Sequence, residues 1–154
     1  MSSGERGAAW YSIPINGNGI LSFDIVPNDW LGAPSTTSTD YDFAIWKITG
    51  SGATNCAAIL SGAAPLRCNY NSYGVTGCNS NIINTAPAAY PGFNFAYETE
   101  INVVSGEVYA LVVSNFTNST SGFSLNFNPG SPINYTSAGT TITWSGGTNT
   151  TWSL

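Results

Sequence analysis

The chain has 154 residues, which suits one domain with a single hydrophobic core. Only 7% of the residues are charged, whereas 42% are hydrophobic and 13% are aromatic, so we expect a folded protein whose surface is hydrated through hydroxyl and amide groups. The net charge of −5 leaves few cations to neutralise phosphates, which argues against nucleic acid and anionic membrane surfaces as partners. No apolar run approaches the roughly 20 residues of a membrane span.

Two short segments near the N-terminus alternate apolar and polar residues, as half-buried strands do. Residues 10–15 read WYSIPI, and residues 19–27 read GILSFDIVP. The intervening Asn-Gly-Asn-Gly supplies residues that accept positive φ, which tight hairpin turns require. The sequence therefore predicts a β-hairpin at the start of the domain.

A polar, turn-rich segment then leads into residues 40–48, DYDFAIWKI, where apolar and polar positions again alternate. We expect a central strand here. Further strands are predicted in FAYETEINVV, EVYALVVSNF and GFSLNF, which follow one another with short turns as in an antiparallel meander. With seven or eight short strands and no sustained helical period, the sequence predicts an all-β fold, an antiparallel β-sandwich of jelly-roll type.

The composition changes after residue 128, where Thr, Ser and Gly dominate and TTITW predicts one more strand. We place a boundary near Pro129. Residues 1–128 then form the sandwich module, and residues 129–154 form a linker that carries an extra strand or the start of a following module.

Residues 49–95 lose the alternation and fill with Gly, Asn, Ala and Pro, although CAAILSG is compatible with a short helical turn. A long irregular loop is unusual unless it is functional or covalently constrained. It contains all three cysteines, so one disulfide and one free thiol is the simplest arrangement. Pairing Cys56 with Cys68 is preferred because it closes a Gly/Ala-rich segment, and pairing Cys68 with Cys78 is the alternative.

The chain contains no histidine, so neither a Ser-His nor a Cys-His nucleophile can be assembled. A glycosidase would need two carboxylates across a cleft. No spacing among the acidic residues suggests such a catalytic pair. The candidates are Asp24, Asp29, Asp40, Asp42, Glu98, Glu100 and Glu107. We therefore expect a protein that is not an enzyme.

Asp40 and Asp42 form the most suggestive acidic pair, because alternate residues of a strand point the same way and can share a hard cation. Asp24 on a neighbouring strand and Asn115 at the end of EVYALVVSNF could add oxygen ligands, which predicts a calcium site. The alternative is that Asp40 and Asp42 bond the free amides of the preceding loop, as Asp often does at such junctions.

Several aromatic residues occur where exposed rings could stack on sugars. Trp30 lies in a turn-rich loop, and Trp46 is predicted to face away from the side of its strand that carries Phe43 and Ile45. Three tyrosines lie in the irregular segment: Tyr70, Tyr73 and Tyr90. Because tryptophans in strands more often serve packing, Trp30 is a better candidate for ligand contact than Trp46.

The segments GAAWYSIPI, LSFDIVP, DYDFAIWKI, CAAIL, PLRCNY, TGC, SGEVYALVVSNF and GFSLNF, in this order, resemble a module of large bacterial surface proteins. Those proteins carry gliding-motility-associated or type IX secretion sorting domains, and the module is similar to pre-peptidase C-terminal and CUB-like jelly-roll domains. The resemblance covers about residues 4–128. It implies an exported, non-enzymatic domain of adhesins or of multidomain enzymes, with calcium common among relatives.

The resemblance also implies site residues: Asp40 and Asp42 from DYDF, and Cys68 as the disulfide partner of Cys56. Cys78 departs from the pattern. The first ten residues, MSSGERGAAW, lack the apolar segment of a signal peptide, so we expect an export signal to lie upstream or to have been removed. The expected location is extracellular or at the cell surface.

Two functions are compatible with these features. The leading hypothesis is a non-catalytic module that binds a polysaccharide or a cell-surface glycan. The alternative is a structural spacer of a large adhesin, stiffened by calcium and by the disulfide. In either case neighbouring domains of the same parent chain are expected partners.

Overall fold

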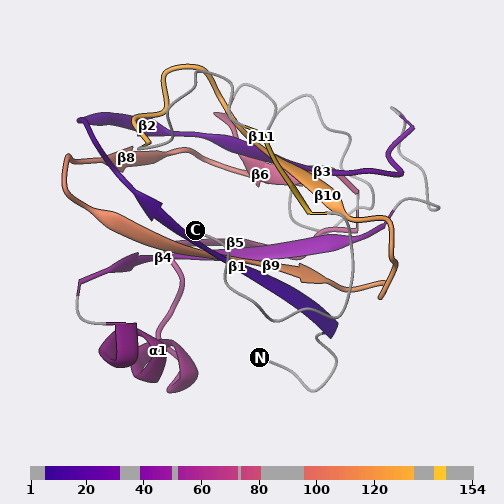
Figure 1. Ribbon diagram of the computed structural model, residues 1–154, viewed down its shortest axis with the longest axis horizontal. Helices are drawn as coiled ribbons and strands as arrows, with labels where there is room; N and C mark the ends of the chain where they lie inside the picture. The colour runs from indigo at the N-terminus through magenta and orange to yellow at the C-terminus, as the bar shows by residue number, and fades with distance from the viewer. Residues whose placement is uncertain are drawn as a thin grey trace.

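The computed structural model describes residues 6–31, 39–49, 52–72, 74–80, 96–133 and 141–144. Two β-sheets pack face to face as two layers, and one short helix lies outside them (Figure 1). The predicted all-β sandwich is therefore confirmed, with antiparallel pairing at every strand pair except one.

The first sheet has the strand order β1-β9-β4-β5. Its strands are β1 (Arg6–Pro14), β9 (Val108–Asn115), β4 (Tyr41–Ile48) and β5 (Arg67–Asn69). β9 pairs with β1 on one side and with β4 on the other, antiparallel in both cases. Because β4 lies between β9 and β5, the central strand predicted from DYDFAIWKI is confirmed.

The second sheet has the order β11-β10-β3-β6-β7. It consists of β11 (Thr141–Trp144), β10 (Phe123–Phe127), β3 (Phe23–Pro27), β6 (Thr76–Cys78) and β7 (Tyr97–Glu98). β6 and β7 are the parallel pair. The strand predicted from TTITW is confirmed as β11, which pairs with β10 and so extends the same sandwich.

Two further strands and one helix complete the description. β2 (Gly19–Leu21) and β8 (Ile101–Val103) form a small antiparallel sheet beside the start of β3. The helix α1 (Gly52–Leu60) lies below the first sheet in Figure 1 and is longer than the single turn that the sequence indicates.

Period-two alternation of burial builds the core between the sheets. Every second residue is buried along β3 and along β4 as far as Ile45. The aromatic rings of the two sheets meet directly, with the Phe23 and Phe43 centroids 5.5 Å apart. Burying each large apolar side chain contributes about 1.5–3 kcal/mol. Among the described residues, the apolar side chains with no exposed surface are Ile13, Leu21, Phe23, Ile25, Ile45, Cys78, Leu111, Val113 and Leu125.

The N-terminal hairpin prediction is wrong. The strands exist, but β1 pairs with β9 in the first sheet, whereas β3 belongs to the second sheet. Neither Gly17 nor Gly19 has the positive φ of a tight hairpin turn. The chain instead crosses between the layers, where Ile15 forms an isolated bridge with Ile133.

The meander prediction is also wrong, although its strands are present. β8 pairs with β2, β9 with β1 and β4, and β10 with β3 and β11. The consecutive strands β8, β9 and β10 therefore lie in three different sheets. Each strand needs to bury one face, and pairing with a sequence neighbour is only one way to do so.

The segment predicted to be a long irregular loop holds α1, β5 and β6. Within it, Cys78 is a core residue with no exposed surface, opposite Phe23 of β3. Cys56 and Cys68 are exposed, and all three cysteines are free thiols in this structure. Neither the preferred Cys56–Cys68 disulfide nor its alternative is therefore formed, and burial in the core separates Cys78 from the two exposed thiols.

Candidate functional site

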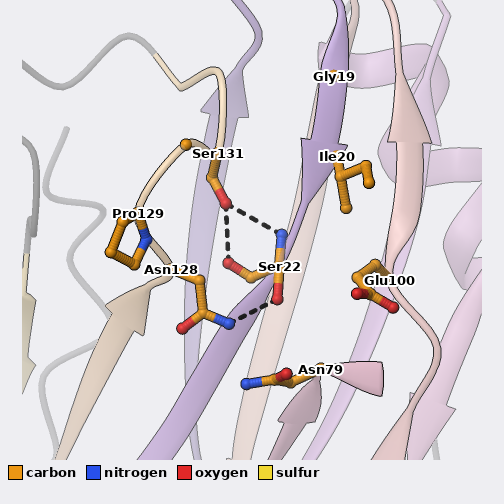
Figure 2. A pocket seen from close by; sticks show the side chains of 9 residues that line it. Gly19, Ile20, Ser22, Asn79, Glu100, Asn128, Pro129 and Ser131 are labelled. Atoms are coloured by element: carbon orange, nitrogen blue, oxygen red, sulfur yellow. Dashed lines mark hydrogen bonds between the residues drawn. The ribbon is translucent and has the colours of Figure 1, made fainter. Parts of the chain in front are cut away.

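An open pocket of about 600 Å³ lies beside the junction of β2 and β3 (Figure 2). This volume is within the usual range for small-molecule sites, roughly 300–1,000 Å³. The described residues that line it are Gly19, Ile20, Ser22, Asn79, Glu100, Asn128, Pro129, Gly130 and Ser131.

Strand alternation explains why polar side chains gather here. Ser22, Asn79, Glu100 and Asn128 each adjoin a buried core residue, respectively Leu21, Cys78, Ile101 and Phe127. Successive side chains of an extended segment point to opposite faces, so these four point away from the core. Strands far apart in the sequence thus bring polar groups to one place on the outer face.

Ser22 is the centre of a hydrogen-bond relay that sets the polarity of one wall. Its Oγ donates to the Cys78 carbonyl at 2.9 Å and accepts from Nδ2 of Asn128 at 2.6 Å. Because a carbonyl only accepts, the single hydroxyl proton of Ser22 is used there, and Asn128 must face Ser22 with its amino group. The acceptor Oδ1 of Asn128 is therefore turned away from Ser22, as Figure 2 shows.

The segment after β10 is held against Ser22 by further bonds. The Ser22 amide donates to Oγ of Ser131 at 3.1 Å, and that Oγ donates to the Ser22 carbonyl at 3.0 Å. The Asn128 amide also donates to the Ser22 carbonyl. Gly130, with φ of 91°, makes the turn between them. These bonds fix the wall before any ligand arrives.

The opposite wall carries Asn79 and the acidic residue Glu100. The Asn79 amide donates to the Glu98 carbonyl, and its Nδ2 donates to Oδ1 of Asp24 at 3.1 Å. The Ser80 amide donates to Oε2 of Glu100 at 3.2 Å. Burial raises the pKa of Asp24, and the Asn79 hydrogen bond lowers it in part. Ile20, 51% exposed, and Pro129 add apolar surface to this polar pocket.

The four residues predicted to bind calcium are not brought together. Asp24 and Asp42 both alternate with core residues, but on strands of different sheets, so they lie on opposite outer faces of the sandwich. Asn115 is buried, and its side chain bonds the Ser119 amide and carbonyl. Asn115 does lie near Asp40, because Thr117 Oγ1 accepts from the Asp40 amide at 3.3 Å and donates to Oδ1 of Asn115 at 3.4 Å. Asp40, Asp42 and Asn115 are therefore close to one another, Asp24 is not, and calcium binding stays a prediction.

Asp40 itself is in an unusual environment. It is 9% exposed, and its Oδ1 has no hydrogen-bond partner among the residues that the structure describes. Burial raises the pKa of its carboxyl to about 6. The alternative role, in which Asp40 bonds a free amide of the preceding loop, is filled at Thr39 by Asp29. The Thr39 amide donates to both carboxylate oxygens of Asp29. No group of three or more metal-ligating side chains occurs in the described parts of the chain.

The predicted aromatic ligand contacts are dispersed. Trp30 is half-buried and packs against the small cluster of Val75, Ala96 and Tyr97. Trp46 faces outward, as expected, where it stacks on Trp10 at 5.9 Å and donates from Nε1 to the Ala63 carbonyl.

Tyr70 is 66% exposed, whereas Tyr73 and Tyr90 lie outside the described residues. None of the five predicted aromatics is among the described residues that line the pocket. Of the lining residues, Glu100 was named from the sequence, as one of the acidic residues available for a glycosidase pair. The other polar lining residues carry no sequence signal beyond their positions at strand ends in an Asn- and Ser-rich chain.

The chain matches no protein-family model, no curated protein and no solved structure. Among the described residues, no helix has both the length and the apolar character needed to cross a membrane. The fold and the pocket geometry are therefore the basis for a functional proposal.

Proposed function

We propose that this chain is a non-catalytic extracellular module that binds carbohydrate at the pocket beside Ser22. The observation that carries the proposal is the wall of pre-oriented amide and hydroxyl groups in a 600 Å³ pocket with an apolar flank. Pre-organised groups reduce the ordering cost of binding. The extracellular location rests on the resemblance to modules of bacterial surface proteins.

The chemistry of the pocket suits a sugar. Sugar hydroxyls need hydrogen-bond partners, and Asn128 offers Oδ1 while Glu100 offers carboxylate oxygens. Sugar rings also present C–H surface, which Ile20 and Pro129 can cover. A few placed polar groups with apolar walls are the common composition of small-molecule sites.

A binding role is favoured over hydrolysis by the groups available. Glycoside hydrolysis needs two carboxylates that flank the scissile bond, and Glu100 is the one carboxylate among the described lining residues. The Ser22 hydroxyl is engaged with a carbonyl, and the sequence contains no histidine to activate it.

Titration calorimetry against soluble oligosaccharides chosen from a glycan array tests the proposal. Asn128→Ala should weaken binding at least tenfold, a loss of about 1.4 kcal/mol. Asn102→Ala, an exposed asparagine on β8 outside the pocket, is the matched control and should bind as the wild type does. If Tyr70→Ala or Trp30→Ala abolishes binding while Asn128→Ala does not, the sugar binds at an aromatic site instead.

The second candidate function is a structural spacer stiffened by calcium at Asp40 and Asp42. The buried Oδ1 of Asp40 favours it, because a cation would compensate a carboxylate oxygen that lacks a hydrogen-bond donor. A chelator should then lower the melting temperature, and Asp42→Ala should remove that difference. An unchanged melting curve after dialysis against chelator would exclude a calcium-stiffened spacer.

A further inference from the structure

We infer that the pocket beside Ser22 selects sugars that carry an ammonium group, that is, amino sugars without an N-acetyl group. The inference rests on the proposed carbohydrate-binding function and specifies its ligand. It follows from the hydrogen-bonding polarity and the charge of the pocket walls, which are both set by contacts within the fold.

The first wall presents an acceptor. The relay from Asn128 through Ser22 to the Cys78 carbonyl uses the Asn128 amino group inside the protein. Flipping the amide would place Oδ1 against the Ser22 oxygen, whose proton is already donated to the Cys78 carbonyl. Asn128 can therefore offer a ligand its Oδ1, which prefers a donor such as a hydroxyl or an ammonium.

The second wall presents a carboxylate that no described cation pairs with directly. Glu100 accepts one bond, from the Ser80 amide to Oε2, and forms no ion pair with any described residue. Figure 2 shows Glu100 on the side of the pocket opposite Asn128 and Pro129. A ligand in the pocket therefore has the Asn128 side chain on one side and the Glu100 carboxylate on the other.

No cationic side chain offsets this charge among the described lining residues. Lys47 forms an ion pair with Glu107. Arg67 donates from Nε to the carbonyl and hydroxyl of Thr99, next to Glu100 in sequence, and keeps its charge there, but it does not line the pocket. The chain as a whole carries a net charge of −5. Uronic acids and sulfated sugars would bring a second negative charge beside Glu100, which disfavours them.

An ammonium satisfies the Glu100 carboxylate by a charge-assisted hydrogen bond, about twice as strong as a neutral one. A ring hydroxyl of the same sugar can then donate to Oδ1 of Asn128. An N-acetyl group removes the positive charge, so neutral N-acetylated and unsubstituted sugars should bind through hydroxyl contacts alone.

The test uses β-1,4-linked tetrasaccharides of glucosamine, N-acetylglucosamine, glucose and glucuronic acid, titrated calorimetrically in the same buffer. Glucosamine should bind about tenfold tighter than glucose and should lose that advantage at high salt. Glucuronic acid should bind weakest. Glu100→Gln keeps an acceptor for the Ser80 amide and should reduce the glucosamine affinity to the glucose value while leaving glucose unchanged.

The outcomes separate the inference from the proposed function. Equal affinities for glucosamine and glucose, or a preference that survives in Glu100→Gln, overturn the amino-sugar inference while the carbohydrate-binding proposal stands. Failure of the wild type to bind any of the four tetrasaccharides, or any sugar on a glycan array, overturns both. Circular dichroism of the variant confirms that the comparison is made between folded proteins.

Discussion

Replacing Ser22 by alanine should both destabilise the sandwich and disorganise the pocket. The side chain is 8% exposed and makes two hydrogen bonds, to the Cys78 carbonyl at 2.9 Å and from Asn128 at 2.6 Å. Each intramolecular hydrogen bond contributes about 0.5–1.5 kcal/mol net, so the free energy of unfolding should fall by about 1–3 kcal/mol. The side-chain amide of Asn128 also loses the hydroxyl that orients it, so the affinity for sugar should fall together with stability.

Urea denaturation followed by tryptophan fluorescence measures the first effect, and the midpoint should fall with little change in slope. Ser124→Ala is the matched control, because Ser124 lies on the outer side of β10 and makes a single long bond of 3.4 Å to Asn28. Its effect should stay below about 0.5 kcal/mol. If Ser22→Ala and Ser124→Ala have the same small effect, the relay does not stabilise the fold and the pocket polarity inferred from it is wrong.

Three further predictions concern backbone packing, pH and thiols. Gly77→Ala would drive a Cβ into a backbone carbonyl of β3, so we expect a loss above about 3 kcal/mol by urea denaturation. The Asp40 pKa rises from 3.8 to about 6 on folding, so the contribution of Asp40 to stability should be highest below pH 4 and fall as the pH rises through 6. Asp40→Asn should remove this contribution to the pH slope and gain about 1–2 kcal/mol at neutral pH, after allowance for residual solvation. A thiol-reactive dye should label Cys56 and Cys68 in the native protein and Cys78 only after unfolding.

Each of these has a clear contrary result. Normal stability of Gly77→Ala would mean that β6 and β3 are not as close as the structure places them. A pH profile of Asp40→Asn parallel to that of the wild type, measured in chelator, would assign the slope to another group. Fewer than two native thiols would indicate that Cys56 and Cys68 pair as the family resemblance implies.

The alternation in residues 40–48 was sufficient to predict β4 and which of its side chains face the core, because period-two burial is a local property of an extended chain. The same reasoning placed Trp46 outward and found the strand now seen as β11. It missed α1 beyond one turn, because a nine-residue helix without capping charges leaves little periodic signal.

The sequence did not predict which strands pair with one another. The alternation in residues 10–15 fits β1 equally well beside its neighbour in sequence or beside β9, and the structure has the second arrangement. Register and sheet membership depend on which distant strands complete the core. Both the hairpin and the meander predictions failed for this reason, and so did the calcium set that needed Asp24 beside Asp42.

The sequence by itself determined an all-β chain with few charges, no histidine chemistry and strands whose inner faces can be assigned residue by residue. Only the tertiary structure decided where polar groups converge. The Ser22–Asn128 hydrogen bond joins residues 106 positions apart, and the Ser22–Cys78 bond joins residues 56 apart. Local patterns determine which face of a strand a side chain occupies, but the long-range pairing of strands determines which other side chains lie next to it. The pocket is lined by residues that only this pairing brings together.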